Sequence, residues 1–500
     1  MKSLYTLLLI LLVSVPARTQ DTTLIPRELF FQPKDIHGIH LSPDGRRVYY
    51  QRFSEGASVL FYRAVDTASQ ERQLAFEGPL LDWMPTHEGQ LLVFLETAGR
   101  QKRLWLTDQQ GKRLRDLTPF PLLELRLEAL SRQYPAKVAV YIKALSVAQN
   151  GVYLIDMEQN AGERLSPLLG FSRRFYDGDL QLVAAERDSP AGGRSIYTKE
   201  GELWKPLIEY PFDESMFIGG LQQVLSVSED GKRLYLTDNR EKDKTVLLEH
   251  ELETGVQRVL VADARADILP HGAIIGANGW PQMVLGQWGQ PSRHFLQGDT
   301  RRDFEWLDRK LAGQAGFVDR STDGRVWLVR RIDGGPLHYY LFRRGRRTLT
   351  PLFNDYPALD SFRLADRYTF TVRTRDSLEL PVQVYLPPGS DENHDGVPDT
   401  LLPTLLYVHG GPWAGVTHWN SWFHTRNFQL LANRGYAVIN TEFRGTTGLG
   451  KAMTRRGDRQ WGEAMHRDLI DIANWAIRRE IADYQRLGIW GWTYGGYAAA

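Results

Sequence analysis

The sequence predicts two folded parts: a β-propeller of about seven blades, followed by a doubly wound α/β domain with a mostly parallel sheet. A pattern of a turn followed by an alternating apolar strand recurs through the first two thirds of the chain. Strands that alternate with helices fill the last third. The chain has 500 residues, which is too long for one hydrophobic core and independently favours two domains.

Three segments show the repeat most clearly: LSPDGRRVYY from Leu41, VSEDGKRLYL from Val227 and RSTDGRVWLV from Arg320. The Asp-Gly dipeptide supplies the positive φ of a tight turn, and the alternation after it indicates a half-buried strand. With four weaker copies, the turns fall at positions 45, 89, 136, 178, 231, 279 and 324. This period of about 40–50 residues is typical of propeller blades, so we expect a propeller over residues 28–352. The alternative is a pair of β-sandwiches with chance spacing.

The pattern changes after residue 352, where strands and helices alternate. In order, we expect strands at 368–372, 380–386 and 405–408, a helix at 421–434, a strand at 436–443, a helix at 463–481 and a strand at 486–490. The stretch 405–408 is continuously apolar, like a strand buried on both faces of a parallel sheet. The helix at 463–481 carries its apolar residues on one stripe. This alternation predicts a doubly wound sheet over residues 353–500.

Composition excludes several classes of function. The chain has 61 basic and 60 acidic residues, so there is no electrostatic case for a nucleic-acid partner or an anionic membrane surface. It has no cysteine, which excludes disulfides, thiolate catalysis and cysteine-ligated zinc.

The N-terminus has the layout of a signal peptide over residues 1–17. Lys2 precedes an apolar run, and small residues follow up to Ala17. The run is shorter than the ~20 residues that span a membrane comfortably, so we expect no stable membrane anchor. We expect an exported protein, periplasmic or secreted, cleaved near Ala17. A buried N-terminal strand or helix is the alternative, and an anchor is a second one.

The segment Gly491-Trp492-Thr493-Tyr494-Gly495 has the form G-x-S-x-G, with threonine in the place of serine. In α/β-hydrolases this sharp strand-to-helix turn presents the catalytic nucleophile. The N–H of the next residue usually helps to bind the developing oxyanion. Thr493 is therefore the candidate nucleophile position, and Tyr494 is a candidate oxyanion donor.

A second donor usually comes from a loop that follows an earlier strand. His409-Gly410-Gly411-Pro412 follows the apolar strand at 405–408, which makes the backbone N–H of Gly411 the candidate. Each motif alone is a weak signal, but the two occur in the right order and each follows an apolar strand. We expect the backbone of this loop to act rather than the His409 imidazole, whose simplest interpretation is a polar residue at the end of a strand.

Four segments resemble the peptidase domain of the prolyl oligopeptidase family: YVHGGPWAGVTHWN, NTEFRGTTGLGK, WGEAMHRDLIDIANWAI and GIWGWTYGGYAA. The closest resemblance is to the acylaminoacyl-peptidase and dipeptidyl-aminopeptidase-like branch. It is specific over residues 403–500 and architectural before them. It implies a serine-type peptidase that needs no cofactor and acts on short peptides, with the propeller excluding folded proteins. No Glu-Glu pair occurs in the propeller region in the setting that dipeptidyl peptidase IV uses, which argues against strict Xaa-Pro cleavage.

The sequence departs from this family in two respects. The methyl group of Thr493 crowds the strained turn. In this fold the acid and the histidine follow the nucleophile along the chain. The upstream histidines come too early for that role: His394, His409, His418, His424 and His466. We therefore expect a piece of a longer protein that lacks the catalytic Asp and His, and no peptidase activity from the chain as written.

Two further interpretations of this part remain open. The first is a non-catalytic propeller protein whose degenerate hydrolase domain serves binding. The second is an esterase or lipase, which the propeller and the Arg444-Gly445 region disfavour.

The segment DENHDGVPD resembles a calcium-binding loop. Oxygen-bearing side chains occupy positions 1, 3, 5 and 9 of this loop, with Gly396 at position 6, and they belong to Asp391, Asn393, Asp395 and Asp399. The glutamate usual at position 12 is replaced by Leu402. Calcium is therefore a possible ligand, and a solvated acidic loop rich in turn formers is the alternative.

Overall fold

The computed structural model describes residues 23–500, except 35, 55–56, 66–69, 98, 168–169, 202, 216–220 and 416–420. The expected signal peptide and His418 lie outside these described residues. Within the described part, no helix combines the length and the apolar character needed to cross a membrane.

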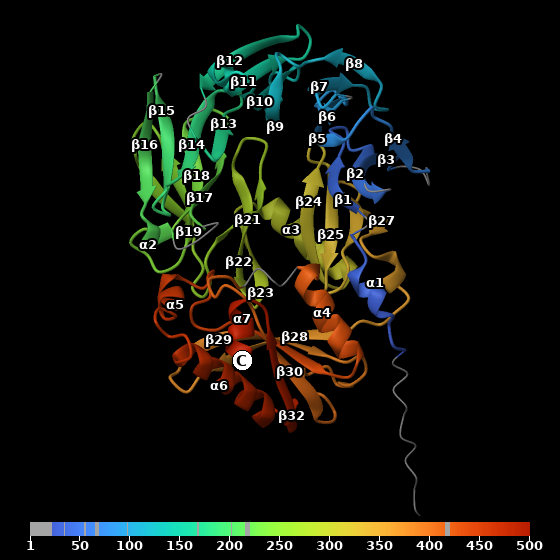
Figure 1. The fold of residues 1–500 in the computed structure, drawn as a ribbon, viewed down its shortest axis with the longest axis vertical. Coiled ribbons are helices and arrows are strands. Elements are labelled where there is room, and N and C mark those ends of the chain that lie inside the picture. The colour runs from blue at the N-terminus through green and yellow to red at the C-terminus, as the bar shows by residue number, and fades with distance from the viewer. Residues whose placement is uncertain are drawn as a thin grey trace, which may run out of the picture.

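Seven small antiparallel sheets form the propeller, which confirms the predicted architecture and its seven blades (Figure 1). The first four blades contain β1 (Ile36–Leu41), β2 (Arg47–Ser54), β3 (Ala57–Ala64), β4 (Arg72–Leu74); β5 (Leu80–Pro85), β6 (Leu91–Glu96), β7 (Lys102–Thr107), β8 (Arg113–Asp116); β9 (Leu122–Leu130), β10 (Lys137–Ala144), β11 (Gly151–Asp156), β12 (Ala161–Pro167); and β13 (Arg173–Tyr176), β14 (Leu182–Asp188), β15 (Arg194–Glu200), β16 (Leu203–Tyr210). The last three contain β17 (Gln223–Val227), β18 (Arg233–Asp238), β19 (Val246–Glu251), β20 (Gln257–Val261); β21 (Leu269–Ile275), β22 (Pro281–Trp288), β23 (Gln290–Phe295); and β24 (Gln314–Arg320), β25 (Val326–Ile332), β26 (His338–Arg343), β27 (Thr348–Asn354). The helical elements of this part are α2 (Phe212–Ser215), α3 (Gly298–Leu311) and the short 3-10 turn η1 (Val147–Gln149).

Each of the seven turn positions lies between the first and second strands of a blade, so the sequence repeat marks the same hairpin every time. Gly279 shows why one of them is glycine. Its φ is +80°, and a Cβ there would lie 1.9 Å from the carbonyl oxygen of Val227 in the preceding blade. Neighbouring hairpins also bond directly, as in the Thr322 N–H that donates to the Pro43 carbonyl at 2.8 Å. The turns therefore connect the blades to one another.

The last part of the chain forms one five-stranded sheet in the order β28-β29-β31-β30-β32. Its strands are β28 (Asp366–Arg373), β29 (Glu379–Leu386), β30 (Leu402–Val408), β31 (Ala437–Thr441) and β32 (Ala482–Gly491). β30 pairs in parallel with both β31 and β32, whereas β28 and β29 are antiparallel. The parallel half matches the prediction. The antiparallel half arises because a short turn at 374–378 joins β28 to β29, which leaves no room for a helical crossover.

Helices cover both faces of this sheet, as the doubly wound prediction requires. Side chains alternate along β29: Val384 faces a core that contains Leu469 and Ile472, and Tyr385 faces a core that contains Phe428. The helices are α4 (Trp422–Asn433) on the Tyr385 face and α6 (Ala464–Arg478) and α7 (Tyr494–Ala499) on the other, with α5 (Lys451–Arg455) between β31 and α6.

The N-terminal segment packs on the α/β part. Ile25 and Phe30 are fully buried together with Tyr356 and Leu359, and the Ile25 N–H donates to the Asn433 side chain at 2.8 Å. Helix α1 (Arg27–Phe31) and the short 3-10 turn η2 (Pro357–Leu359) belong to this contact. Helix α1 therefore lies against α4, although almost all of its residues fall in the range expected for the propeller. Hydrophobic burial gives the reason, because Phe30 finds its partners there.

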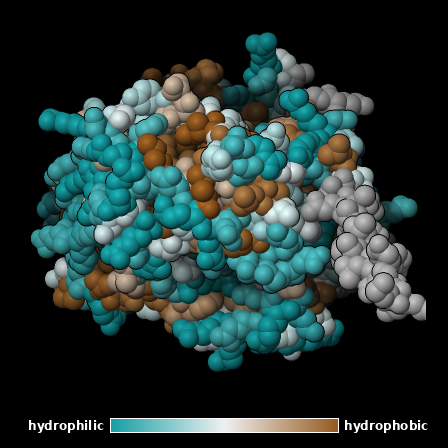
Figure 2. Space-filling view, turned by 90° about the horizontal axis from the view of Figure 1, so that it is seen from below, coloured by the Kyte–Doolittle hydropathy of each residue, from teal (hydrophilic) through white to brown (hydrophobic). Residues whose placement is uncertain are grey.

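The propeller lies above the sheet of the α/β part in Figure 1, and β32 is the outer strand of that sheet. Seen from below, this end of the molecule shows hydrophobic patches on a mostly hydrophilic surface (Figure 2). Tyr484 and Ile489 of β32 are among the exposed large side chains, at 70% and 38%.

Candidate active site

Thr493 lies on a sharp turn between β32 and α7. Its φ of 49° and ψ of −113° fall outside the regions that β-branched residues ordinarily adopt. The flanking glycines explain how the turn closes. A Cβ on Gly491 would lie 2.3 Å from the carbonyl carbon of Gly495, and one on Gly495 would lie 1.9 Å from the Val408 carbonyl oxygen. The structure therefore has the strained strand-to-helix elbow that the motif predicts.

The His-Gly-Gly loop meets this elbow. The backbone N–H of Gly411 donates to the Oγ1 of Thr493 at 3.2 Å. Gly410 has to be glycine at this contact, because a Cβ there would lie 2.3 Å from the same Oγ1. Tyr494 is the first residue of α7, where backbone N–H groups have no acceptor within the helix. The two candidate oxyanion donors thus flank residue 493.

The His409 side chain is fully buried and packs beneath the His-Gly-Gly loop. Its ring stacks on Phe443 with 4.4 Å between the centroids. Its Nε2 lies 3.1 Å from the Thr446 hydroxyl and 3.1 Å from a carboxylate oxygen of Glu442. These contacts fix the imidazole on the far side of the loop from solvent. His409 is placed to hold the loop rather than to reach a substrate.

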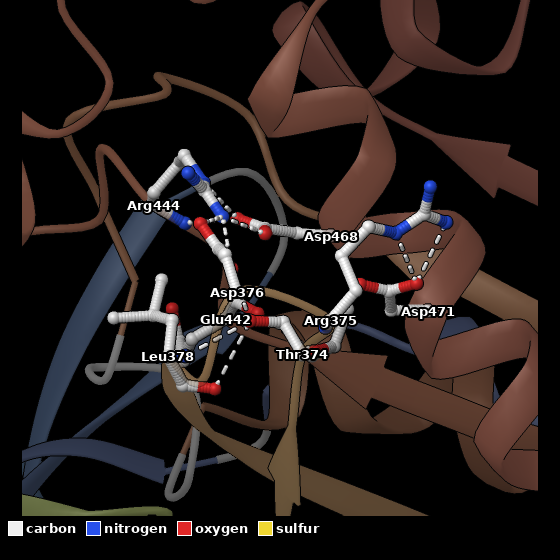
Figure 3. A network of polar contacts seen from close by, with 9 residues as sticks. Thr374, Arg375, Asp376, Leu378, Glu442, Arg444, Asp468 and Asp471 are labelled. Carbon is white, nitrogen blue, oxygen red and sulfur yellow. Dashed lines mark hydrogen bonds and ion pairs between the residues drawn. The ribbon is translucent and has the colours of Figure 1, made fainter.

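A buried arginine organises the segment after β31 (Figure 3). Arg444 donates to both carboxylate oxygens of Asp468, at 2.6 and 2.8 Å, and also to Asp376 at 2.9 Å. The hydrogen bonds that Arg444 donates to Asp468 outweigh the opposing effect of burial and raise the pKa of the Arg444 guanidinium. A second pair, Arg375 and Asp471, joins the same hairpin turn to α6. The sequence analysis did not predict this network. The only signal for it in the sequence is that Asp468 and Asp471 lie three residues apart and so share one face of α6.

Aromatic side chains surround the elbow. Trp492 is 58% exposed and lies 6.1 Å from the ring of Phe423. On the other side, Trp461 packs edge-on against Tyr494 at 4.9 Å and also contacts Tyr497. Exposed aromatic rings beside a nucleophile position offer apolar contact to a ligand. The sequence analysis did not single these residues out, although Trp492 and Tyr497 adjoin the motif.

The other upstream histidines lie apart from one another. His424, on α4, has its Nδ1 3.2 Å from the Tyr407 hydroxyl. Burial, with smaller contributions from His409 and Arg426, lowers the pKa of His424 to about 4. His394 lies in the 391–399 loop, and His466 is on α6. None of these three histidines belongs to the turn that carries Thr493.

The 391–399 loop is closed by its own hydrogen bonds. Asp391 is 3% exposed, and its carboxylate accepts the backbone N–H groups of Asp395 at 3.3 Å and Gly396 at 2.9 Å. The Asn393 side chain accepts the Asp395 N–H, and Asp399 accepts the N–H of residue 392. Within the described residues, no group of three or more acidic or histidine side chains is placed to hold a metal ion. The calcium hypothesis therefore receives no support from the geometry.

Comparison with known proteins agrees with this site. The model of the prolyl oligopeptidase family matches residues 421–500. The chain is 29% identical to dipeptidyl aminopeptidase BIII of Pseudoxanthomonas mexicana, over 97% of this chain and 70% of that protein. Over residues 421–500 the chain is therefore similar to the prolyl oligopeptidase family. This match supports a hydrolase of the serine-peptidase type and confirms the resemblance drawn from the motifs.

Two further similar proteins match nearly the whole chain. Dipeptidyl peptidase family member 6 of Caenorhabditis elegans is 23% identical, over 98% of this chain and 70% of that protein. The solved structure of the Pyrococcus horikoshii acylaminoacyl peptidase superimposes with a TM-score of 0.62 at 14% identity, over 95% of this chain and 76% of that one. At this identity the structural likeness concerns the fold, which pairs a propeller with an α/β-hydrolase domain.

Proposed function

We propose that the protein hydrolyses short peptides by acyl transfer at residue 493, as an acylaminoacyl- or dipeptidyl-peptidase-like enzyme. The observation that carries this proposal is the contact between the Gly411 N–H and the Thr493 hydroxyl on a strained elbow. A hydroxyl beside preorganised backbone donors is the arrangement that acyl transfer requires. The names of the relatives, a dipeptidyl aminopeptidase and an acylaminoacyl peptidase, support the choice of substrate class.

In this proposal the hydroxyl of Thr493 attacks the carbonyl carbon of the scissile peptide bond. The N–H groups of Gly411 and Tyr494 stabilise the negative charge that develops on the carbonyl oxygen. A hydroxyl near its normal pKa is scarcely ionised at neutral pH, so the attack needs a general base. In this fold the base is a histidine that follows the nucleophile along the chain. His409, fixed by Thr446 and Glu442, does not fill that role.

A rate assay on three purified proteins tests the proposal. They are this 500-residue chain, a longer form that carries an acid and a histidine after the elbow, and that longer form with Thr493→Ser. We expect no peptidase activity from the first, because losing a triad costs about a million-fold. We expect slow turnover of a chromogenic acyl-peptide by the second and a gain of orders of magnitude in the third. Ordinary enzyme rates from the 500-residue chain would refute the assignment.

The threonine keeps one other function open, a pseudo-hydrolase that binds peptides without cleaving them. The strained φ of Thr493 supports it, since the added methyl group makes this backbone conformation costlier than for an unbranched residue. If Thr493→Ser brings no gain in the longer form, residue 493 is not the nucleophile position. Peptide binding measured by calorimetry without hydrolysis would then favour the binding function.

We also propose that the protein is exported and cleaved near Ala17. The support is the sequence alone: Lys2, the apolar run after it and the small residues before Arg18. Mass spectrometry of protein recovered from the periplasm or the medium should find a mature N-terminus near Arg18. An intact Met1 in that fraction would reject this proposal.

A further inference from the structure

Two propeller carboxylates hold the segment that leads into α5. Asp267, in the connection between β20 and β21, is 3% exposed. Its carboxylate accepts the Thr245 N–H at 2.6 Å and the Gly450 N–H at 2.9 Å. Its own backbone N–H donates to the Gly448 carbonyl at 3.0 Å. Asp267 therefore bonds both to the propeller, just before β19, and to the hydrolase part.

Asp243, in the connection between β18 and β19, makes the second contact. Its Oδ1 accepts the Ala452 N–H at 2.7 Å, and its backbone carbonyl accepts the Lys451 N–H at 2.8 Å. A Cβ on Gly450 would lie 2.7 Å from this carboxylate, so the close approach requires glycine. Lys451 also forms an ion pair with Glu214 of α2. In Figure 1, α5 lies below α2 and the blade of β17–β19.

These contacts perform the task of a helix cap. The first N–H groups of a helix have no acceptor within it, and a preceding side chain usually supplies one. The residue before α5 is Gly450, which has no side chain to do so. The propeller supplies the acceptors instead, and two negative charges also favour the positive end of the helix. The position of α5 thus depends on the propeller.

The α5 segment bonds in turn to the residues that follow β31. The Gly445 N–H donates to the Met453 carbonyl at 3.0 Å, and the Thr454 hydroxyl donates to the Thr446 carbonyl at 3.1 Å. Thr446 is fully buried, so it has little freedom to move without its neighbours.

Thr446 and Thr447 then contact the loop that carries the oxyanion donor. The Thr446 hydroxyl lies 3.1 Å from His409, and the Thr447 N–H donates to the Ala414 carbonyl at 3.1 Å. The fit is tight, because a Cβ on Gly415 would lie 2.1 Å from the Thr446 methyl group. A continuous set of contacts therefore runs from the propeller to the 409–415 loop, which places Gly411 against Thr493.

We propose that Asp267 and Asp243 of the propeller are positioning residues for the 409–415 loop. Through α5 and Thr446 they set where the Gly411 N–H lies relative to residue 493. The propeller thereby fixes the geometry of the hydrolase site. This inference rests on the proposed function in taking Gly411 as an oxyanion donor, and such donors work only when they are held in place before the reaction.

Hydrogen exchange on the 500-residue chain tests the inference without requiring activity. In Asp267→Ala, peptides covering residues 444–456 and 405–415 should both exchange at least several-fold faster than in the wild type. Asp267→Asn, which keeps one acceptor oxygen, should give an intermediate rate in both. The matched control is Glu379→Gln, which removes the exposed interdomain ion pair with Arg265 and leaves the hydrogen bonds of Asp267 and Asp243 in place. In the control, exchange of both peptides should stay at the wild-type rate.

The coupling itself is tested by cutting the contact at Thr446. In a Thr446→Val background, Asp267→Ala should still speed exchange at 444–456 but add less at 405–415 than in the wild type, since the Thr447–Ala414 bond still joins the two segments. Faster exchange confined to 444–456 in Asp267→Ala alone would overturn the inference. So would an equal effect of Glu379→Gln on the loop.

A form of the protein that hydrolyses peptides gives a second readout. There Asp267→Ala should lower kcat about tenfold or more and change KM less, because oxyanion donors act mainly in the transition state. A change in KM alone would contradict a positioning role. If no form hydrolyses peptides, the proposed function fails, and the exchange results still decide whether the propeller positions the loop.

Discussion

The backbone N–H of Gly411 lies 3.2 Å from the Oγ1 of Thr493, although 82 positions separate the two residues. The parallel pairing of β30 with β32 brings them together, since Val408 lies opposite Gly491 at the end of both strands. The carboxyl ends of neighbouring parallel strands open at the same edge of a sheet, which is where such folds place their ligands. Two short motifs that are weak signals separately therefore become one site.

Gly410→Ala should disable this site while leaving the fold intact. The added Cβ would lie 2.3 Å from the Thr493 hydroxyl, so the loop has to move away from the elbow. In a form that hydrolyses peptides, kcat should fall about 100-fold, the size expected for losing one oxyanion donor. The control is Gly345→Ala in the propeller, where a Cβ has nothing within 4 Å. Equal rates for the two variants would contradict the assignment of this loop.

Asp468→Ala should strongly destabilise the hydrolase part. The Asp468 side chain is fully buried, and its loss leaves the Arg444 charge buried with only the half-exposed Asp376 as partner. Removing one partner of a buried ion pair typically costs about 3–5 kcal/mol. The free energy of unfolding from urea titration, followed by tryptophan fluorescence, measures this.

The nearby pair of Arg375 and Asp471 provides the control. Arg375 is 54% exposed, and exposed ion pairs contribute little to stability. Arg375→Ala should therefore change the unfolding midpoint much less than Asp468→Ala. If both variants lowered the unfolding midpoint by a similar amount, the buried Arg444–Asp468 pair would not contribute more to stability than the exposed Arg375–Asp471 pair.

The fold was predictable where local signals repeat. An Asp-Gly turn depends only on its own backbone conformation. A few residues are therefore enough to locate the hairpin of a blade, as at Gly45 and Gly231, whose φ is positive. The elbow was predictable because its motif is local, and Gly491 is required by a contact within the turn, whereas Gly495 is required by the Val408 carbonyl of β30. Pairing direction was less accessible: nothing in the sequence of β29 alone says that its partners are antiparallel.

Contacts between distant residues could not be read from the sequence. Asp267 and Gly450 are 183 positions apart, and Asp267 belongs to no motif. Arg444 and Asp376 likewise meet only when the hairpin turn folds onto the α6 face. The 391–399 loop is a different case: its spacing of oxygen atoms suggested a metal, and in the structure the side chains accept backbone N–H groups of the loop itself.

His424 should make the protein less stable as the pH falls from about 6.5 to about 4. Its pKa in the folded protein is about 4, lowered by burial and by nearby His409 and Arg426, against an ordinary value of 6.5. Between these pH values His424 is protonated in the unfolded chain but mostly neutral in the folded chain. The free energy of unfolding therefore falls as the pH falls. His424→Gln should lose less stability than the wild type between pH 7 and pH 4.5 in urea titrations. Parallel losses in both proteins would show that other groups govern this range.

Asp391→Ala should lower the melting temperature equally with a chelator and with millimolar calcium. The buried carboxylate accepts the N–H groups of Asp395 and Gly396. The Asp395 N–H keeps the Asn393 side chain as an acceptor, but the Gly396 N–H would be left unsatisfied at a cost of about 1–3 kcal/mol. Asp395→Ala is the matched control: its carboxylate accepts the Val397 N–H at 2.8 Å on an exposed part of the loop, so the loss should be smaller. If a chelator lowers the melting temperature of the wild type but not that of Asp395→Ala, calcium holds the loop. In that case the hydrogen bonds seen within it describe only the metal-free state, and the spacing of Asp391, Asn393, Asp395 and Asp399 was the better guide.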